Sequence, residues 1–399
     1  MITPDDLARD ANPLAPFYQH FRVGERLLLT GHSHQAWPDV GFHAHRQAWE
    51  DAAQYVDDKW ERAFAMAARV REGYARLLAD SRGHMALASS THDLVVRFLS
   101  ALPLRERPRI VTTDGEYHSL RRQLKRLEEE GIDVVWVPMD PVEDLASRLA
   151  VAVNDRTAAA CVSAVLFRSA RIVPRLAAVQ DACVRHGAEL FVDAYHAVNV
   201  VPFSIPDARL ERAFVVGGGY KYCQLGEGNC FLRFPEESAH RPVVTGWFSE
   251  FSALATSVEH DRTAYGQGDD RFAGATYDPT SHYRAAAVFD FFAEQALTPD
   301  VLRAASQHQV GVLAAAFDAL DLPPGVIDRD RHVPLEAIGG FLALATPYAE
   351  TVCAGLRARG VLTDYRDRTL RFGPAPYLSD RQLRDAIGHL GETVRALTP

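Results

Sequence analysis

Residues 213–222 read AFVVGGGYKY, an apolar run followed by three glycines and by a lysine between two tyrosines. The run is typical of a short buried strand, and the glycines leave room for another group to approach the backbone closely. Lysine is rare in this chain and occurs only at positions 59, 125 and 221. Lys59 and Lys125 lie in charged stretches typical of exposed helices, whereas Lys221 follows a strand and has uncharged neighbours. Lys221 is therefore the residue that most needs an explanation.

Apolar runs like the one before Lys221 recur along the chain, and helical stretches separate them. Each run is short enough to be a strand buried on both faces, as in parallel sheets. The alternation predicts an α/β fold in which helices flank both faces of a mainly parallel sheet. The expected strands are 109–114, 133–139, 158–167, 188–198, 213–219 and 229–234, and the expected helices between them begin near residues 118, 142 and 174.

The two ends of the chain differ from this middle part. A helical pattern rich in alanine, arginine and aromatic residues covers about 42–78, with a break in mid-course. From about residue 281 the chain is mostly helical, with strand candidates at 339–346 and 369–374. The stretch 263–280, rich in glycine, aspartate and threonine, predicts a long loop of a kind that is often functional.

These patterns predict two domains and an accessory segment. We expect a large α/β domain over 41–285, with a sheet of seven strands, and a smaller α+β domain over 286–399. The N-terminal segment 1–40 is expected to pack with the smaller domain.

Composition excludes several classes of protein. A formal net charge of −9 and a pI near 6.0 argue against a general nucleic-acid surface, and the mixed charges of 121–130 are typical of a solvated helix face. The five cysteines are widely spaced without a CxxC pair, so neither a zinc ribbon nor a disulfide framework is indicated. The N-terminus lacks the pattern of a signal peptide, and no apolar run approaches about 18 residues. We expect a cytoplasmic protein that binds neither nucleic acid nor membrane.

The position of Lys221 has two explanations. An amine at the carboxyl edge of an open α/β sheet lies where such sheets bind ligands, and a buried amine can form a Schiff base at neutral pH. The alternative is a lysine that extends along the strand end into solvent. The residues around Lys221 alone do not decide between them.

Two other segments favour the first explanation. Asp193 ends the strand before the lysine strand, where it could contact the ring nitrogen of pyridoxal phosphate, although it could also be a capping residue. Ser89, Ser90 and Thr91 precede a helix, where hydroxyl and backbone N–H groups hold a phosphate or simply cap the helix. A phosphate cradle, a carboxylate and a lysine in this order form one coherent cofactor site.

Four local motifs resemble one family. DAYHAV (193–198), GYKY (219–222), GWF (246–248) and RFGPAPYLSD (371–380) are similar to segments of the fold-type I pyridoxal-phosphate enzymes of the class V aminotransferase group, and specifically of its kynureninase branch. The resemblance covers the chain from about residue 25 to its end. It implies pyridoxal 5'-phosphate as the cofactor, an amino acid as the substrate, and a homodimer with the site at the subunit interface.

Carried over position by position, the resemblance implies specific roles. Lys221 would bind the cofactor covalently, Asp193 would contact its ring nitrogen, and Tyr220 would carry protons, which makes these three the catalytic residues. Arg371 would bind the substrate carboxylate, because a planar guanidinium suits that task. The implied cofactor-binding residues are Ser90, Thr91, Tyr117, Ser169, Asp193, His196, Tyr220, Lys221, Trp247 and Thr276, of which Trp247 and Thr276 would reach the partner's site.

Some assignments stay open at this point. His118 competes with Tyr117 for stacking on the cofactor ring, and Thr280 competes with Thr276 as the phosphate ligand from the partner subunit.

Three departures from the family pattern fall where the substrate is selected. Ser249 and Glu250 follow GWF where the family often has Gly-His, and the segment around Thr276 differs as well. The segment LLLTGHSHQAWP (27–38), near the N-terminus, differs from the family pattern and carries His32 and His34. No carboxylate or cysteine cluster accompanies these two histidines in the sequence, so we expect them to line the substrate pocket and not to bind a metal.

The resemblance implies a kynureninase-like reaction, in which water adds to the side-chain carbonyl of kynurenine or 3-hydroxykynurenine and the Cβ–Cγ bond breaks to release alanine. The alternatives are C–S cleavage or β-elimination of a cysteine-type substrate, and a class V aminotransferase or epimerase. A desulfurase is disfavoured, because Cys353 lies in a helical pattern and not in a flexible loop. A catalytically silent binding protein is disfavoured by the intact set of Lys221, Asp193 and Arg371.

Overall fold

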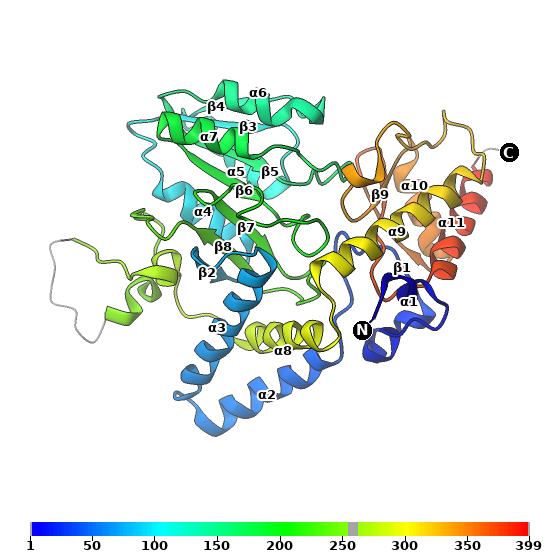
Figure 1. Cartoon of the computed structure of the whole chain (residues 1–399), viewed down its shortest axis with the longest axis horizontal. Helices are drawn as coiled ribbons and strands as arrows, with labels where there is room; N and C mark the ends of the chain where they lie inside the picture. The colour runs from blue at the N-terminus through cyan, green and yellow to red at the C-terminus, as the bar shows by residue number, and fades with distance from the viewer. Residues whose placement is uncertain (1, 254–261, 398–399) are drawn as a thin grey trace.

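The computed structural model describes residues 2–253 and 262–397. Its centre is a seven-stranded sheet with the order β2-β8-β7-β6-β5-β3-β4 (Figure 1). Strands β7, β6, β5, β3 and β4 run parallel, whereas β8 is antiparallel to both of its neighbours, β7 and β2. The strands are β2 (His84–Ala88), β3 (Arg109–Thr113), β4 (Asp133–Val137), β5 (Thr157–Ser163), β6 (Glu189–Asp193), β7 (Phe214–Gly218) and β8 (Cys230–Phe234).

Helices cover both faces of this sheet, and each face has its own apolar core. Helices α4 (Thr91–Ala101) and α5 (His118–Glu129) pack over Phe191 and Phe214 on one face. Helices α3, α6 and α7 cover the other face, with side chains such as Val70, Leu149 and Val179. Both faces are therefore buried, as the apolar strand sequences require. The bounds are α3 (Lys59–Leu77), α6 (Leu145–Ala152) and α7 (Ala177–His186).

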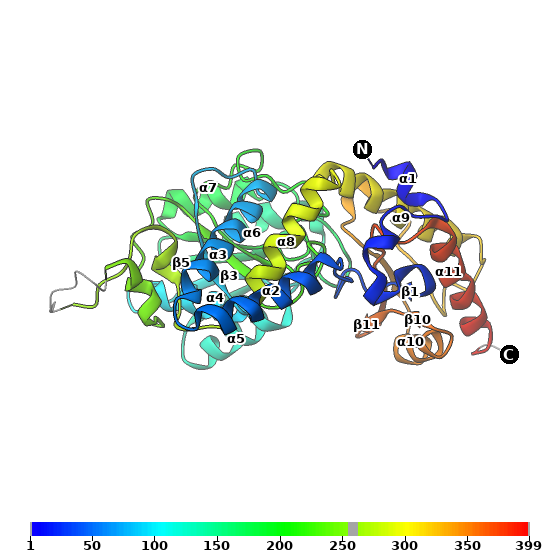
Figure 2. The same ribbon diagram turned by 90° about the horizontal axis from the view of Figure 1, so that it is seen from below.

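A smaller lobe holds both ends of the described chain (Figure 2). Its three-stranded antiparallel sheet has the order β11-β12-β9, and β1 near the N-terminus pairs in parallel with β10. Its elements are α1 (Pro4–Ala8), β1 (Leu27–Leu28), α9 (Pro299–Asp318), β9 (Leu342–Ala345), α10 (Ala349–Ala358), β10 (Val361–Leu362), β11 (Asp364–Arg366), β12 (Thr369–Phe372) and α11 (Asp380–Arg395). Helices α2 (Val40–Tyr55) and α8 (Thr280–Glu294) pack together beside α3.

The predicted fold class is confirmed, including the mainly parallel seven-stranded sheet and the break in the helical pattern between α2 and α3. The sequence patterns missed β2, because its residues HMALA carry little strand preference and lead directly into a helix cap. The segment 263–280 is mostly loop with one 3-10 turn, Gly268–Phe272. The domain boundaries stay a prediction. No helix in the described part of the chain is long and apolar enough to cross a membrane.

Candidate functional site

Lys221 follows the carboxyl end of β7 and is almost fully buried, with 5% of its surface exposed. Its Nζ lies 2.9 Å from Nε2 of His196, a residue in the turn after β6. Burial lowers the pKa of Lys221 to about 7, and Asp193 opposes this shift. Burial and the neighbouring Lys221 lower the pKa of His196 well below its usual value, so that its ring is neutral at pH 7. The pair therefore holds a reactive amine beside a neutral proton acceptor.

Aromatic rings surround the amine of Lys221. Its Nζ lies 4.6 Å from the ring centroid of Tyr195, 5.3 Å from that of Tyr117 and 5.7 Å from that of Tyr220. His34 stacks on Tyr220 with a centroid distance of 4.7 Å. Tyr117 thus lies beside the Lys221 amine, and the choice between it and its neighbour His118 as the ring that would stack on a cofactor stays a prediction.

The close packing of Tyr195 requires a glycine in the lysine strand. A Cβ atom on Gly218 would lie 2.5 Å from the hydroxyl oxygen of Tyr195. A larger residue at position 218 would therefore displace the ring of Tyr195 beside Lys221.

Asp193 ends β6, next to the strand that leads to Lys221. One of its carboxylate oxygens accepts a hydrogen bond of 2.8 Å from the backbone N–H of Tyr195, and burial raises its pKa. A second carboxyl group, Glu116, which the sequence patterns did not single out, contacts Ser163, the residue paired with Asp193 on the neighbouring strand. The carboxyl oxygens of Glu116 accept hydrogen bonds from the backbone and the hydroxyl of Ser163, at 2.9 and 2.7 Å. Burial, together with the charge of Asp193, raises the pKa of Glu116 to about 8.

Ser90 and Thr91 lie at the N-terminus of α4, as the sequence predicts. Ser90 is the N-cap, and its hydroxyl accepts a hydrogen bond of 3.2 Å from the backbone N–H of Asp93. The carboxylate of Asp93 in turn accepts a hydrogen bond of 3.1 Å from Ser89. The first N–H groups of α4 have no partner within the helix, so they can bind an anion.

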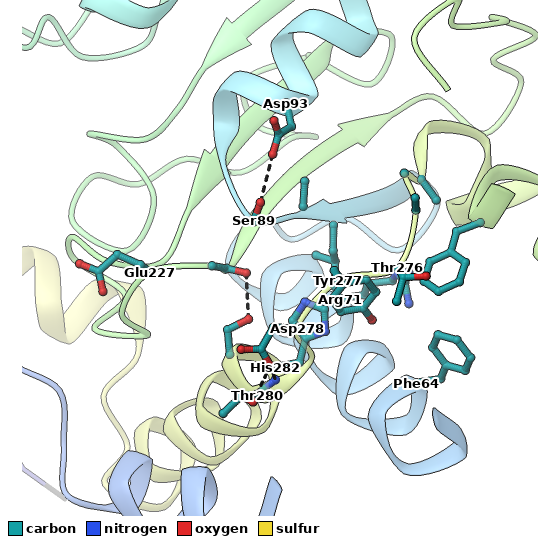
Figure 3. A pocket seen from close by; sticks show the side chains of 18 of the residues that line it. Phe64, Arg71, Ser89, Asp93, Glu227, Thr276, Tyr277, Asp278, Thr280 and His282 are labelled. Carbon is teal, nitrogen blue, oxygen red and sulfur yellow. Dashed lines mark hydrogen bonds between the residues drawn. The ribbon is translucent and has the colours of Figure 1, made fainter. Parts of the chain in front are cut away.

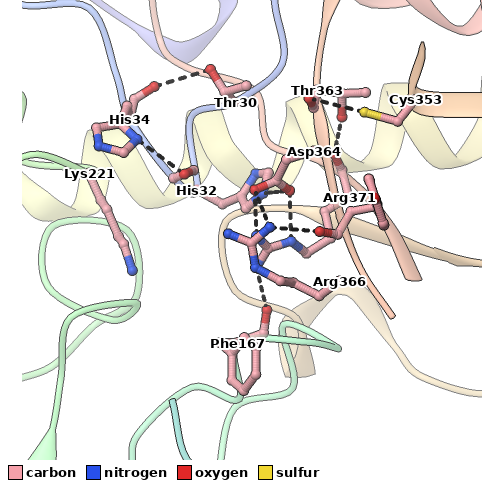
Figure 4. A network of polar contacts seen from close by, with 12 residues as sticks. Thr30, His32, His34, Phe167, Lys221, Cys353, Thr363, Asp364, Arg366 and Arg371 are labelled. Carbon is pink, nitrogen blue, oxygen red and sulfur yellow. Dashed lines mark hydrogen bonds and ion pairs between the residues drawn. The ribbon is translucent and has the colours of Figure 1, made fainter. Parts of the chain in front are cut away.

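Arg371 lies on β12 and donates three hydrogen bonds. Its Nε and Nη2 atoms reach the two carboxylate oxygens of Asp364 at 2.8 and 2.5 Å, and Nη1 reaches the carbonyl of Phe167 at 2.8 Å (Figure 4). Oδ1 of Asp364 also lies 2.7 Å from Nε2 of His32. His32 is fully buried and contacts Asp364. It can therefore influence a bound substrate only through Asp364. His34, by contrast, has an exposed side chain.

The other predicted cofactor residues form hydrogen bonds with residues other than Lys221. Trp247 is 48% exposed, and its indole N–H donates to the hydroxyl of Thr276 at 3.3 Å. The hydroxyl of Thr280, the alternative to Thr276, bonds to its neighbour Asp278 at 2.5 Å. Ser169 lies in the loop after β5 and accepts a hydrogen bond from its own loop, at Arg171.

A cavity of about 860 Å³ lies near the start of α4 (Figure 3). Thr276, Thr280 and Ser89 line it, but Lys221 does not. Thr276 therefore opens onto a different space from the one around Lys221.

The residues around Lys221 fit pyridoxal phosphate. The aldehyde of the cofactor needs an amine, its pyridine nitrogen a carboxylate, its ring a flat face and its phosphate a helix N-terminus. The buried amine with a lowered pKa, the carboxylate at the neighbouring strand end, the ring of Tyr117 and the N-terminus of α4 are groups of these kinds. Lys221, Asp193, Tyr117 and the Ser90–Thr91 turn would hold it.

No protein-family model matches the chain. The uncharacterized aminotransferase YcbU of Bacillus subtilis (strain 168) is 22% identical over 348 residues, which are 86% of this chain and 88% of YcbU. Isopenicillin N epimerase of Streptomyces clavuligerus is 29% identical over 48% of each chain. Kynureninase of Bacillus mycoides (strain KBAB4) is 26% identical over 54% of this chain and 49% of its own. The matches to the epimerase and to kynureninase thus span about half the length of those two relatives.

Solved structures share the fold at low sequence identity. A C-DES variant with glycine covalently linked to its PLP cofactor has a TM-score of 0.80 and 14% identity, over 95% of this chain and 99% of its own. The cysteine desulfurase CsdA of Escherichia coli has a TM-score of 0.77 and 15% identity, over 99% of both chains. The chain thus shares the fold of these pyridoxal-phosphate enzymes and is similar in sequence to class V aminotransferase-like proteins, in agreement with the resemblance seen in its motifs.

Proposed function

We propose that this chain is a lyase or hydrolase that uses pyridoxal phosphate to cleave the side chain of an amino acid, with kynurenine or 3-hydroxykynurenine as the leading substrate. The observation that carries the proposal is the buried amine of Lys221, held 2.9 Å from a neutral His196 and bordered by the rings of Tyr117, Tyr195 and Tyr220. These rings suit the aryl side chain of kynurenine. The partial match to kynureninase supports the same choice.

The chain's own residues supply the proton-transfer chemistry. Because its pKa is about 7, the Lys221 amine is substantially uncharged at neutral pH and can accept the Cα proton of a bound amino acid. His196 would hold Nζ in place for this transfer. Asp193 would keep a proton on the pyridine nitrogen, and the protonated ring supplies an electron sink when the cofactor is bound. Arg371 would bind the carboxylate of the substrate.

A second candidate is C–S cleavage of a cysteine-type substrate. The fold shared with C-DES, whose structure in complex with cysteine persulfide is described as that of a cystine C–S lyase, supports it. All five cysteines are buried, and burial raises the pKa of each thiol. A desulfurase reaction that passes sulfur to a protein thiolate is thus disfavoured, whereas direct release of a sulfur product needs no such thiolate.

The candidates differ in their products. The purified protein would be incubated separately with kynurenine, 3-hydroxykynurenine, cystine and a cysteine S-conjugate, and the products assayed by mass spectrometry. The proposal predicts alanine and an anthranilate from a kynurenine. Pyruvate with a sulfur product would favour the C–S lyase, and amino-group transfer to a 2-oxo acid would favour the aminotransferase named for YcbU. Failure to release alanine from either kynurenine would reject the leading substrate.

We also propose that the enzyme is a homodimer. Trp247 and Thr276 bond to each other at an exposed position, and Thr276 lines a cavity that excludes its own Lys221. A pair placed in this way can complete the site of a second copy.

A further inference from the structure

Two arginines share one carboxylate beside Lys221. Asp364 and Arg371 face each other across the β11–β12 hairpin, and Arg366 lies two residues further along β11. Oδ1 of Asp364 contacts Nε of Arg371 and Nε2 of His32, whereas Oδ2 contacts Nη2 of Arg371 and lies 3.6 Å from Nη1 of Arg366. Both Asp364 oxygens are therefore engaged, and in Figure 4 the two guanidinium groups lie together below this carboxylate.

The charges in this cluster do not balance. Burial lowers the pKa of His32 to about 4, so the ring is neutral at pH 7. Burial would raise the pKa of Asp364, but the contacts with His32 and Arg371 hold it well below its usual range. Among the described residues, neither Arg366 nor Arg371 has a second carboxylate within 4.0 Å. Two positive charges and one negative charge leave one positive charge without a partner.

Arg366 is partly exposed and makes few contacts within the protein. Its side chain is 35% exposed, and its one hydrogen bond among the described residues joins Nη1 to the adjacent carbonyl of Tyr365, at 2.7 Å. Figure 4 draws Arg366 and Lys221 in the same region, and the charge of Arg366 lowers the pKa of both Lys221 and His196. The nearby Arg168, by contrast, is paired with Asp367 at 3.1 Å. Arg366 thus shares its only carboxylate within 4.0 Å, among the described residues, with Arg371, whereas Arg168 has a separate carboxylate partner.

We propose that Arg366 binds the substrate's α-carboxylate together with Arg371, and that Asp364, supported by His32, is a positioning residue that fixes the Arg371 guanidinium. This proposal rests on the proposed function, because it assumes that an amino acid binds at Lys221. The α-carboxylate of one substrate molecule neutralises the unpaired positive charge of the two arginines. The site therefore favours amino acids whose side chains carry no net charge. A second acid group would leave an unpaired negative charge in a partly buried site.

Binding of acids that lack an amino group tests the proposal directly. The holoenzyme would be titrated with 3-phenylpropionate and with succinate by isothermal titration calorimetry. We expect Arg366→Ala to weaken 3-phenylpropionate binding by about tenfold or more, as the loss of a charge-assisted hydrogen bond does, and Arg366→Lys to restore part of it. The matched control is Arg368→Ala, which removes an arginine from the turn of the same hairpin and should leave the affinity within about twofold.

The role of Asp364 is tested separately, because replacing it changes the net charge of the arginine cluster. Asp364→Asn leaves two positive charges without a partner, so succinate should gain affinity relative to 3-phenylpropionate by about tenfold. A merely structural loss would weaken both acids alike. Unchanged affinity in Arg366→Ala, or an unchanged preference in Asp364→Asn, would overturn the proposal.

These binding results separate the two proposals. Arginine-dependent acid binding without turnover of any kynurenine would reject the leading substrate and keep the carboxylate site. Turnover of a kynurenine with affinity that is independent of Arg366 would reject only the carboxylate site.

Discussion

The Nζ atom of Lys221 lies 2.9 Å from Nε2 of His196, inside the protein and beside three tyrosine rings. Neither residue forms an ion pair with a carboxylate among the described residues, so the lysine amine has a neutral partner. A neutral partner in a buried site favours the uncharged form of the amine, whereas a carboxylate partner would favour its charged form.

Lys221 should destabilise the cofactor-free protein at neutral and lower pH. Its pKa is about 7 in the folded chain, below the ordinary value of 10.5, so between these pH values the unfolded chain binds more protons. Stability should rise with pH across this window. Replacing Lys221 with Met removes the penalty, which should raise the unfolding free energy by a few kcal/mol at pH 6 and by much less near pH 10.5. Urea unfolding at several pH values measures the difference, and a gain that is independent of pH would contradict it.

Glu116 should make the stability of the protein depend on pH in the opposite direction. Its folded pKa is about 8 against an ordinary 4.5, so the folded chain binds more protons between these values and stability should fall as pH rises through them. Glu116→Gln retains an oxygen that accepts from the Ser163 N–H but carries no charge. The variant and the parent should be about equally stable at pH 4, whereas the variant should be the more stable at pH 8. The same urea series tests this, and parallel curves would exclude a titrating Glu116.

Asp193→Asn should separate cofactor binding from catalysis. Asparagine can still accept the hydrogen bond from the Tyr195 N–H, so the fold should be retained. It cannot keep a proton on a pyridine nitrogen as a carboxylate does, so turnover should fall by about 10²-fold or more. Absorbance of the bound cofactor and steady-state kinetics on one preparation measure both. Equal turnover in the two proteins would remove Asp193 from the proposed roles.

Complementation tests whether Trp247 and Thr276 serve the partner subunit. Lys221→Ala and the double variant Trp247→Ala/Thr276→Ala should each be nearly inactive. In a mixed dimer, one site combines an intact Lys221 with an intact Trp247 and Thr276 from the other chain, so refolding the two variants together should restore activity. The two variants refolded separately are the control. No restored activity would place these residues in their own subunit's site, or outside any site.

Local patterns predicted most of the large domain and the lysine strand, because buried parallel strands are continuous apolar runs that can be read without their neighbours. The predicted positions of Lys221 at a strand end and of Ser90 at a helix cap agree with the structure. Roles that depend on a second chain remain predictions.

Asp364 and Glu116 were missed for a different reason. Asp364 lies in TDYRDRT, which reads as a charged turn, and its contact with Arg371 depends on the register of a hairpin. Recognising that hairpin, with Asp364 opposite Arg371, could have revealed the pair. Glu116 is next to Tyr117 in sequence, but its burial against Ser163 depends on how β3 and β5 pack, for which the sequence has no local signal.

The central claim is that Lys221 holds the cofactor, and the scarcity of lysine makes a direct test practical. Borohydride treatment of the cofactor-loaded protein, followed by proteolysis and mass spectrometry, locates the amine to which the cofactor is fixed. We predict a pyridoxyl phosphate label on the peptide that contains Lys221, and no label in Lys221→Ala. A label on Lys59 or Lys125, or one that persists in Lys221→Ala, would contradict the account.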